Sequence, residues 1–172
     1  KRSPLCGRNF EYYSEDPLLA GKLAAGFIRG AEGEGVGTSL KHFAVNNQET
    51  LRMSVSAEVD ERALHELYLR PFEIAVKEGA PSTVMCSYNR INGVYASENR
   101  MLLTRILREQ WGFDGLVMSD WGAVYRRPAG VAAGLDLEMP SSGGVTDREI
   151  VRAVRAGRLD EAGAQELMDD FV

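Results

Sequence analysis

The sequence has 172 residues, of which 44% are hydrophobic and 26% charged, a balance that is typical of a folded domain and excludes a disordered or fibrous chain. A formal net charge of −5 favours neither nucleic acid nor an anionic membrane surface as a partner, and it suits a neutral substrate. No apolar run approaches the roughly 20 residues that span a bilayer, so we predict no membrane segment. The chain opens on Lys1 without a signal-type stretch, which leaves a cytoplasmic and a secreted location equally open.

The cysteines and histidines are too few to suggest metal or redox chemistry. Cys6 and Cys86 cannot build a disulfide framework and lack metal-ligand spacing, so we predict two free, buried thiols. His65 lies among charged residues of a predicted helix and is expected at the surface, which leaves His42 as a single candidate ligand. We therefore predict neither a metal nor a cofactor.

Hydrophobic periodicity and turn residues predict an alternation of helices and strands after a loop at residues 1–15. In chain order we expect a helix at 14–30, a strand at 38–43, a helix at 56–79, a strand at 82–88, a helix at 97–111, a strand at 115–120, a helix at 123–133, a strand at 134–140, and helices at 146–156 and 160–171. Pro71 should kink or divide the long third segment, and Pro128 should interrupt the helix at 123–133.

Alternate glycines at 31–37 invite comparison with a nucleotide-binding loop. Such a loop follows a strand and opens a helix, whereas this segment follows a helix and opens a strand. We interpret it as an ordinary helix-to-strand connection.

Strands that alternate with helices predict a parallel sheet covered by helices, an α/β fold. The sequence predicts about four strands, whereas a closed (β/α)8 TIM-type barrel needs roughly eight in about 250 residues. The chain is therefore either a small open sheet or half of a barrel. Polar residues at successive strand ends, namely Lys41, His42, Tyr88 and Asp120, favour the half-barrel, because the strands of a barrel direct their tips into one pocket.

Asp120 is the main candidate for chemistry, because it ends a short buried strand at a Ser-Asp-Trp corner. The structural alternative is that Asp120 caps a following helix, since aspartate is a favoured N-cap.

Three reactions are compatible with the residues at the strand ends. A Schiff-base lyase would use Lys41, a metal hydrolase would use His42 with carboxylates, and a glycosidase would use Asp120 as nucleophile. A lone histidine is a poor metal site, and Lys41 beside a histidine and an aspartate should stay charged. A charged lysine beside Asp120 would keep the carboxylate ionised, which favours the glycosidase.

Several motifs, in order and over nearly the whole chain, resemble glycoside hydrolase family 3 in its β-glucosidase-like branch. The matching segments are GRNFEYYSEDP, KHFAVNNQE, VMCSYNRINGVYASEN, GFDGLVMSDWGAV and AGLDLEMP. The resemblance implies the second half of a (β/α)8 barrel and a retaining exo-β-glucosidase that releases terminal β-linked glucose through a covalent intermediate on Asp120. It further implies that the sugar is bound by Arg8, Lys41, His42, Met85, Tyr88 and Trp121.

Departures from related branches narrow this expectation. The β-N-acetylhexosaminidase branch continues its Lys-His pair with Pro-Gly-His where this chain has Phe43-Ala44-Val45, and the β-xylosidase branch usually has Cys where this chain has Trp121. Both are disfavoured, although a relative acting on β-xylosides remains an alternative.

The family also uses a sugar-binding aspartate from an earlier barrel strand and an acid/base glutamate from a separate α/β sandwich domain. Neither matches this chain, so we expect the remainder of the same enzyme as its partner and take Glu49 and Glu138 as structural. The rival hypothesis is a carbohydrate-binding fragment that has lost catalysis.

Overall fold

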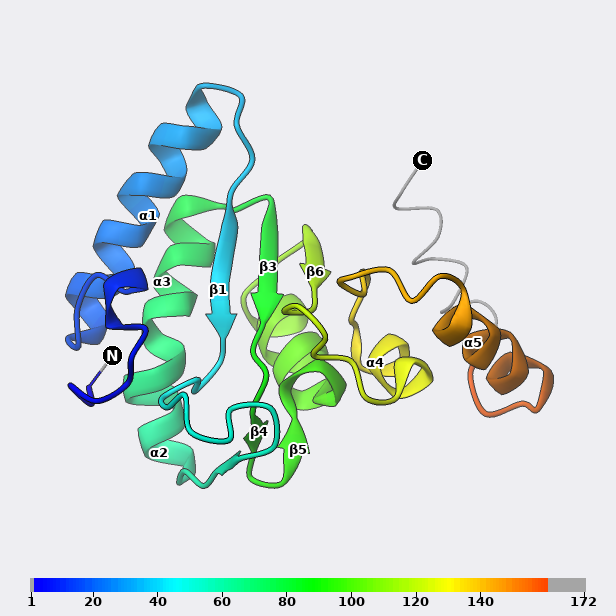
Figure 1. The fold of residues 1–172 in the computed structure, drawn as a ribbon. Helices are drawn as coiled ribbons and strands as arrows, with labels where there is room; N and C mark the ends of the chain where they lie inside the picture. Colours follow the sequence, from blue (N-terminus) through cyan, green and yellow to red (C-terminus); the bar gives the residue numbers. More distant parts are fainter. Residues whose placement is uncertain (1, 161–172) are drawn as a thin grey trace.

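The computed structural model describes residues 2–160, and its elements largely follow the predicted alternation (Figure 1). The helical elements are η1 Asn9–Glu11, α1 Pro17–Gly33, α2 Glu61–Ala63, η2 Leu64–Leu69, α3 Arg70–Gly79, η3 Ala96–Glu98, η4 Met101–Gln110, α4 Arg127–Ala133 and α5 Val145–Arg155. The strands are β1 Ser39–Phe43, β2 Ser56–Ala57, β3 Thr83–Cys86, β4 Arg90–Ile91, β5 Val94–Tyr95 and β6 Leu116–Met118. Beyond its first residue, the helix predicted at 160–171 lies outside the described residues.

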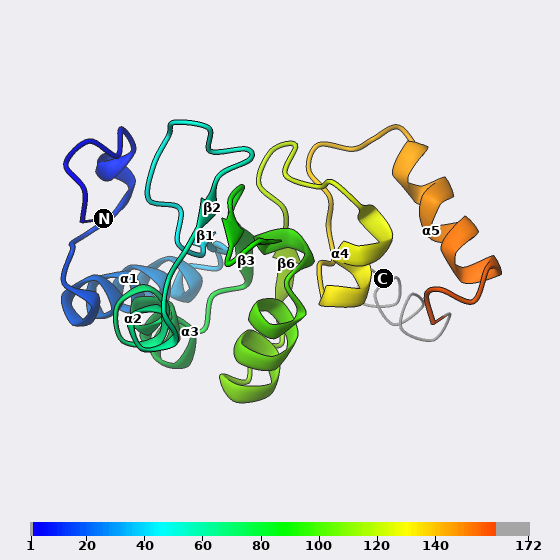
Figure 2. The ribbon, with the colours of Figure 1, turned by 90° about the horizontal axis from the view of Figure 1, so that it is seen from below.

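Within residues 2–160, the main sheet consists of β1, β3 and β6, all parallel and neighbouring in chain order. Helices α1, α3 and η4 connect or flank these strands and lie on the same face of the sheet (Figure 2). A doubly wound sheet would carry helices on both faces, whereas consecutive parallel strands with helices outside are the geometry of a barrel wall. The chain thus folds as a segment of a TIM-type barrel, which confirms the predicted fold class.

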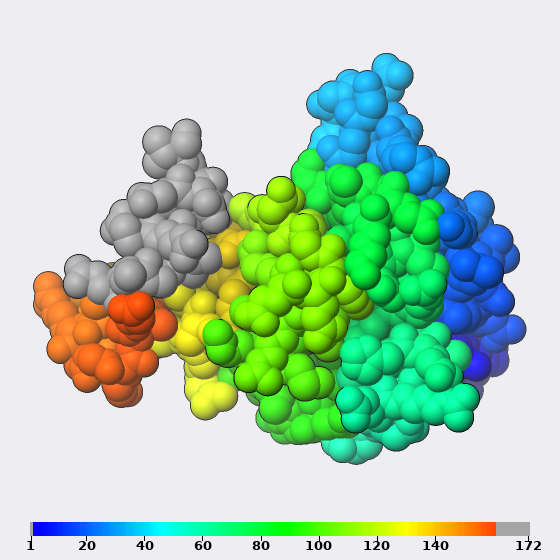
Figure 3. Space-filling model, turned by 180° about the vertical axis from the view of Figure 1, so that it is seen from behind, coloured from blue at the N-terminus to red at the C-terminus, as the bar shows by residue number. Residues whose placement is uncertain are grey.

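The two faces of the sheet differ in burial. On the helix side, Phe43, Val84 and Val117 are fully buried in one core with Phe72 and Val76 of α3 and with leucines and an isoleucine of η4. From behind, α1, α3 and η4 form the surface over this face (Figure 3). The opposite side carries partly exposed Met85 and Met118, so the face that would line the barrel interior is open.

A β-bulge in β1 brings two consecutive polar residues to the open face. Leu40 pairs with Val84 and Phe43 pairs with Cys86, so Lys41 and His42 together stand opposite the single residue Met85. An extra residue in one strand re-aims its side chains. Without the bulge, alternation would send one of the pair into the helix-side core.

The predicted helix at 56–79 is wrong in its first part. Ser56–Ala57 is strand β2, which pairs with β4 in a small second sheet, and the helix begins after Asp60, whose side chain caps it by accepting from the Ala63 backbone N–H. The expected effect of Pro71 is confirmed, since a π-helical segment, η2, separates α2 from α3 and the proline stands in the first turn of α3. Pro128 likewise opens α4 rather than interrupting it.

The segment 134–140 forms a single bridge, Leu137 to Met118, instead of the predicted strand. The Asp136 carboxylate accepts from the Val117 backbone N–H at 2.6 Å and from Arg108 at 2.6 Å. The Asp136 side chain thus accepts the hydrogen bond that a backbone carbonyl of a paired strand would accept, and it connects this segment to β6.

Other predictions about the fold are confirmed within the described residues. Cys6 and Cys86 are free and buried, and burial raises the pKa of the Cys86 thiol to about 12. The glycine-rich segment connects α1 to β1, and His65 is exposed. Across residues 2–160, no helix combines the length and apolarity needed to cross a membrane.

Candidate active site

Asp120 follows β6 at the carboxyl edge of the sheet, and its backbone is held from two sides. The preceding Ser119 is fully buried; its N–H donates to the Leu137 carbonyl at 2.9 Å, and its hydroxyl accepts from the Met139 N–H at 2.8 Å. The next helix, α4, begins only at Arg127 with Arg126 as its N-cap. The helix-cap interpretation of Asp120 is therefore wrong, and its 8% exposed side chain is available for another role.

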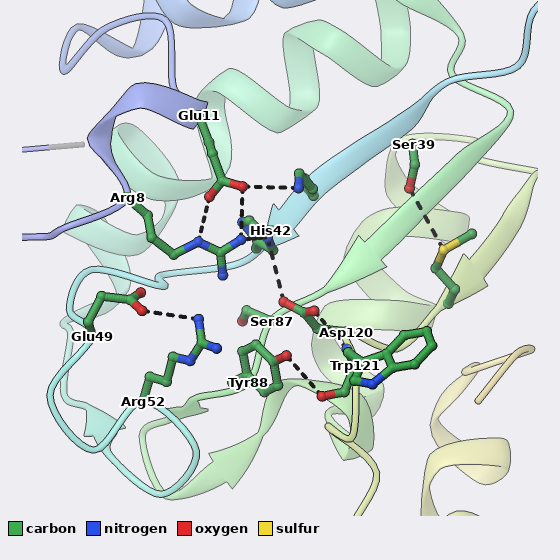
Figure 4. Close-up of polar contacts among 12 residues, drawn as sticks. Arg8, Glu11, Ser39, His42, Glu49, Arg52, Ser87, Tyr88, Asp120 and Trp121 are labelled. Atoms are coloured by element: carbon green, nitrogen blue, oxygen red, sulfur yellow. Dashed lines mark hydrogen bonds and ion pairs between the residues drawn. The ribbon is translucent and has the colours of Figure 1, made fainter. Parts of the chain in front are cut away.

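The two carboxylate oxygens of Asp120 have different surroundings (Figure 4). Oδ1 accepts from the Trp121 backbone N–H at 2.7 Å, which fixes the plane of the carboxylate. Oδ2 is buried and accepts no hydrogen bond from any residue that the structure describes. One oxygen is anchored, and the other faces His42 without a hydrogen bond.

His42 lies 3.5 Å from that second oxygen, measured from Nε2 to Asp120 Oδ2. Burial is the main cause that lowers the pKa of His42 to about 4; Asp120 opposes the shift, and Arg8 and Lys41 add to it. The imidazole is therefore neutral near pH 7, and the contact with Asp120 is not an ion pair.

The hydrogen-bond partners of His42 identify its tautomer. Nη2 of Arg8 lies 3.1 Å from Nε2, and a guanidinium can only donate, so Nε2 accepts. The ring proton is then on Nδ1, which donates to the Tyr12 hydroxyl oxygen at 2.7 Å. Tyr12 and Arg8 together orient the ring beside Asp120.

Lys41, which we expected beside Asp120, instead forms its ion pair with Glu11 at 3.1 Å. Glu11 also binds Arg8, with 2.6 Å between Oε2 and the guanidinium Nε. The Arg8 hydrogen bond, followed in importance by that of Lys41, lowers the pKa of Glu11 to about 2.

The remaining predicted residues border the same region. Tyr88 donates its hydroxyl to the Trp121 carbonyl at 2.9 Å, and burial followed by the charge of Asp120 raises the pKa of the phenol. The Trp121 side chain is 63% exposed, so its ring is free to form a wall at the mouth of the site. Met85 pairs in register with Met118 and lies on the open face of the sheet.

Three residues at the site were missed by sequence reasoning. Glu11 and Tyr12 hold Arg8, Lys41 and His42, and Arg52 lies over the Tyr88 ring at 4.7 Å while pairing with Glu49 at 3.0 Å. The spacing of Arg8 and Glu11 in a turn was a usable signal, because residues three apart in a helical turn are neighbours. Arg52 has the same spacing to Glu49, but its other partner, Tyr88, follows β3 and is distant in sequence.

A cavity of about 120 Å³ is lined in part by Lys41 and His42, and Asp120 is not among its lining residues. It is bordered by Leu40, Tyr68 and Phe72, and by Asn46, whose buried amide makes no hydrogen bond within residues 2–160. Glu11, Lys41 and His42 also border this cavity, so these three residues separate it from Asp120.

Acid should destabilise the protein through His42. The unfolded chain takes up a proton near pH 6.5 whereas the folded site resists protonation down to about 4, so stability falls as the pH drops through this window. The full effect is at most on the order of 3 kcal/mol. Glu11 stays ionised throughout, because its pKa is about 2.

Thermal melts at pH 7 and pH 5 should show a smaller drop in melting temperature for His42→Gln than for the wild type. The exposed-histidine control His65→Gln should match the wild type, and equal losses in all three proteins would contradict this prediction.

Relatives of known activity share most of this chain but are far longer. The chain is 60% identical over 161 residues to thermostable beta-glucosidase B of Acetivibrio thermocellus, and 59% identical over 162 residues to an exo-alpha-(1->6)-L-arabinopyranosidase of Bifidobacterium longum. Both alignments cover 94% of this chain, which spans only 21% of each relative.

Solved structures agree with the sequence comparison. Beta-glucosidase 3B of Thermotoga neapolitana in complex with alpha-D-glucose superimposes with a TM-score of 0.93 at 50% identity, covering 96% of this chain and 24% of that one. A Bifidobacterium adolescentis GH3 beta-glucosidase superimposes with a TM-score of 0.93 at 56% identity, covering 97% of this chain and 24% of that one. The sequence profile of the glycosyl hydrolase family 3 N terminal domain matches residues 1–169. With that profile spanning nearly its whole length, the chain belongs to glycosyl hydrolase family 3.

Proposed function

We propose that this chain carries the nucleophile and part of the sugar-binding site of a retaining exo-β-glucosidase. The observation that carries the proposal is the Asp120 carboxylate, with Oδ1 anchored by the Trp121 N–H and Oδ2 buried without a hydrogen bond. The relatives named as beta-glucosidases support the choice of substrate.

In the proposed reaction, Asp120 Oδ2 attacks the anomeric carbon, and the bond from that carbon to the leaving oxygen breaks. The leaving oxygen takes a proton from a general acid that we place in the remainder of the same enzyme. Water then attacks the glycosyl ester, the same group removes a proton from that water, and glucose leaves with retained configuration while Asp120 is freed.

The charged residues are assigned to sugar hydroxyls rather than to proton transfer. Arg8 and Lys41 are donors, and neutral His42, held by Arg8 at Nε2 and by Tyr12 at Nδ1, borders the sugar without supplying a proton. Met85, Tyr88 and Trp121 supply apolar and aromatic surface to the sugar ring.

The geometry at Lys41 argues against the Schiff-base lyase. An amine must lose its proton to attack a carbonyl, and the Glu11 carboxylate at 3.1 Å stabilises the ammonium form. Borohydride trapping with a carbonyl substrate should therefore leave Lys41 unmodified.

A second substrate class is favoured by two relatives, each named exo-alpha-(1->6)-L-arabinopyranosidase, at 59% and 58% identity. An α-L-arabinopyranoside presents its leaving group equatorially, as a β-glucoside does, but it lacks the hydroxymethyl group and carries its 4-hydroxyl axially, whereas a β-xyloside lacks only the hydroxymethyl group. Turnover of aryl β-glucoside, α-L-arabinopyranoside and β-xyloside by the complete protein decides between these classes. Binding of sugars without turnover of any member of the panel would instead support a non-catalytic carbohydrate-binding role.

Replacing Lys41 by alanine should reduce kcat/KM by about 10- to 100-fold, because a hydrogen bond from a charged donor contributes roughly 1.5 to 3 kcal/mol. The configuration of the released sugar, followed by NMR, should stay unchanged. Replacing Lys77, which pairs with Glu73 on α3, provides a matched lysine control that should keep wild-type turnover. Inversion of the product, or wild-type kcat/KM in Lys41→Ala, would contradict the assigned role.

A further inference from the structure

Glu11 binds two cations of the site, Arg8 and Lys41, and has no part in the proposed chemistry. We propose that Glu11 is a positioning residue, which holds Arg8 and Lys41 in the orientation that meets the sugar and keeps both cations off Asp120. The inference rests on the proposed glycosidase function, because it describes how that site is kept ready for substrate.

Three hydrogen bonds from two side chains converge on this carboxylate (Figure 4). Glu11 Oε1 accepts from Lys41 Nζ at 3.1 Å and from Arg8 Nη2 at 2.9 Å, while Oε2 accepts from Arg8 Nε at 2.6 Å. The two-point contact with Arg8 fixes the plane of the guanidinium. The side chains of Glu11 and Arg8 are 15% and 19% exposed, so the pair is shielded from most solvent competition.

The arrangement depends on two independent pieces of backbone. The turn η1 places Glu11 three residues after Arg8, and the Glu11 N–H donates to the Arg8 carbonyl. The bulge in β1 turns Lys41 toward this loop. Glu11 thus joins the first loop to the strand that carries the Lys41–His42 pair.

The balance of charge shows why a third group is needed. Arg8 and Lys41 carry two positive charges, Glu11 and Asp120 carry two negative charges, and His42 is neutral near pH 7. Glu49 is already paired with Arg52, so if Glu11 lost its charge, Asp120 would be the carboxylate left without a cation for Arg8 and Lys41 to approach. Arg8 already reaches His42 Nε2, which is 3.5 Å from Asp120 Oδ2, so a small rotation would bring it to the nucleophile.

A carboxylate engaged by a cation attacks less readily, because its negative charge is stabilised in the ground state. Loss of the Glu11 charge should therefore lower kcat, whereas loss of its position alone should chiefly raise KM. Glu11→Gln removes the charge and keeps the length, and Glu11→Asp keeps the charge and shortens the reach.

In the complete enzyme, Glu11→Gln should reduce kcat/KM for an aryl β-glucoside by about 10- to 100-fold, mostly through kcat. Glu11→Asp should keep kcat within about threefold and raise KM. In a Lys41→Met background, the additional loss from Glu11→Gln should shrink at least about threefold, because the two residues act as a unit. Glu15→Gln, an exposed glutamate of the same loop, is the matched control and should lie within about twofold of the wild type.

A crystal structure of Glu11→Gln should show Arg8 or Lys41 turned onto Asp120. Unmoved cations in that crystal, strictly additive losses in the double variant, or equal kcat losses for Gln and Asp would each overturn the inference. If wild-type protein hydrolyses no glycoside, the proposed function fails, and the position of the two cations in the variant crystal still decides the role of Glu11.

Discussion

Asp120→Asn in the complete enzyme should lower the turnover of an aryl β-glucoside by about 10⁴-fold or more, the largest single-residue effect that we expect. The amide preserves the shape of the carboxylate but cannot form the glycosyl ester, so the attacking group is removed while the pocket remains. The exposed Asp114, in the loop before β6, offers a control for an Asp→Asn change nearby, and Asp114→Asn should keep wild-type turnover. Residual activity in Asp120→Asn within tenfold of the wild type would contradict the assignment.

A trapping experiment identifies the nucleophile directly. A 2-fluoro-β-glucoside with an activated leaving group should form a stable ester on the wild-type enzyme, and peptide mass mapping should place the label on Asp120. Azide added to an Asp120→Ala variant should restore cleavage and yield an α-glycosyl azide, because the small anion attacks from the face that Asp120 occupied. Label on any other carboxylate would exclude Asp120 as nucleophile.

Residues 1–172 produced alone should neither fold cooperatively nor hydrolyse a β-glucoside. The outward face of α1 exposes Leu18, Leu19, Leu23 and Phe27 by 46% to 64%. Burying a large apolar side chain contributes about 1.5 to 3 kcal/mol to the free energy of unfolding. Leaving four of them exposed therefore loses an amount comparable with the total stability of a domain, about 5 to 15 kcal/mol.

Other features of the same side of the molecule also lack partners. Strand β1 is an edge of the sheet within the described residues, and edge strands tend to pair with other chains. The nearby cavity holds the Asn46 amide, and a buried amide without hydrogen bonds costs about 1 to 3 kcal/mol. We infer that preceding strands of the same enzyme cover this side.

Circular dichroism melting and aryl glucoside turnover of the isolated segment test this expectation, with the complete protein as the positive control. A missing general acid alone would reduce the rate by about 10²- to 10⁴-fold even if the segment folded. A cooperative melt together with steady turnover would contradict the half-barrel interpretation, and Glu49 or Glu138 would then become the candidate acid. Glu49 pairs with Arg52 at 3.0 Å, and Glu138 accepts from the Thr146 hydroxyl.

Two variants of the complete protein test whether the apolar face of α1 is covered by the remainder of the enzyme or exposed to solvent. Phe27→Ser should lower the free energy of unfolding by about 3 kcal/mol if the remainder of the enzyme packs on this face. Val36→Ser, at a 61% exposed position of the connection after α1, should change it by less than about 0.5 kcal/mol. Equal, small effects would show that α1 faces solvent in the complete enzyme.

The order of the elements and the residues at the strand ends follow from local sequence. Buried parallel strands are short apolar runs, and polar residues directly after them must lie at the carboxyl edge of the sheet. That is why Lys41, His42, Tyr88 and Asp120 were predictable as one group before any contact was known. The motif resemblance then indicated the family, which the profile match over residues 1–169 confirms.

Local pattern was misleading where pairing with a distant segment competes with it. Ser56 and Ala57 continue an amphipathic helical pattern, yet they pair with Arg90 and Ile91 in a small sheet. The segment around Leu137 has strand composition, but the Asp136 side chain occupies the Val117 N–H. Tertiary context outweighs weak propensity in both places.

The partners that are distant in sequence could not be predicted from the sequence. Glu11 and Lys41 are 30 residues apart, and Arg8 and His42 are 34 apart. Neither contact produces a periodic pattern that could be recognised in the sequence. The bulge that turns Lys41 and His42 to one face depends on the register between β1 and β3, which forms only when the strands pair. The order of residues along the chain therefore determined which residues reach the pocket. Only the tertiary structure decided their contacts: Asp120 has one oxygen without a hydrogen bond, and Glu11 binds Arg8 and Lys41.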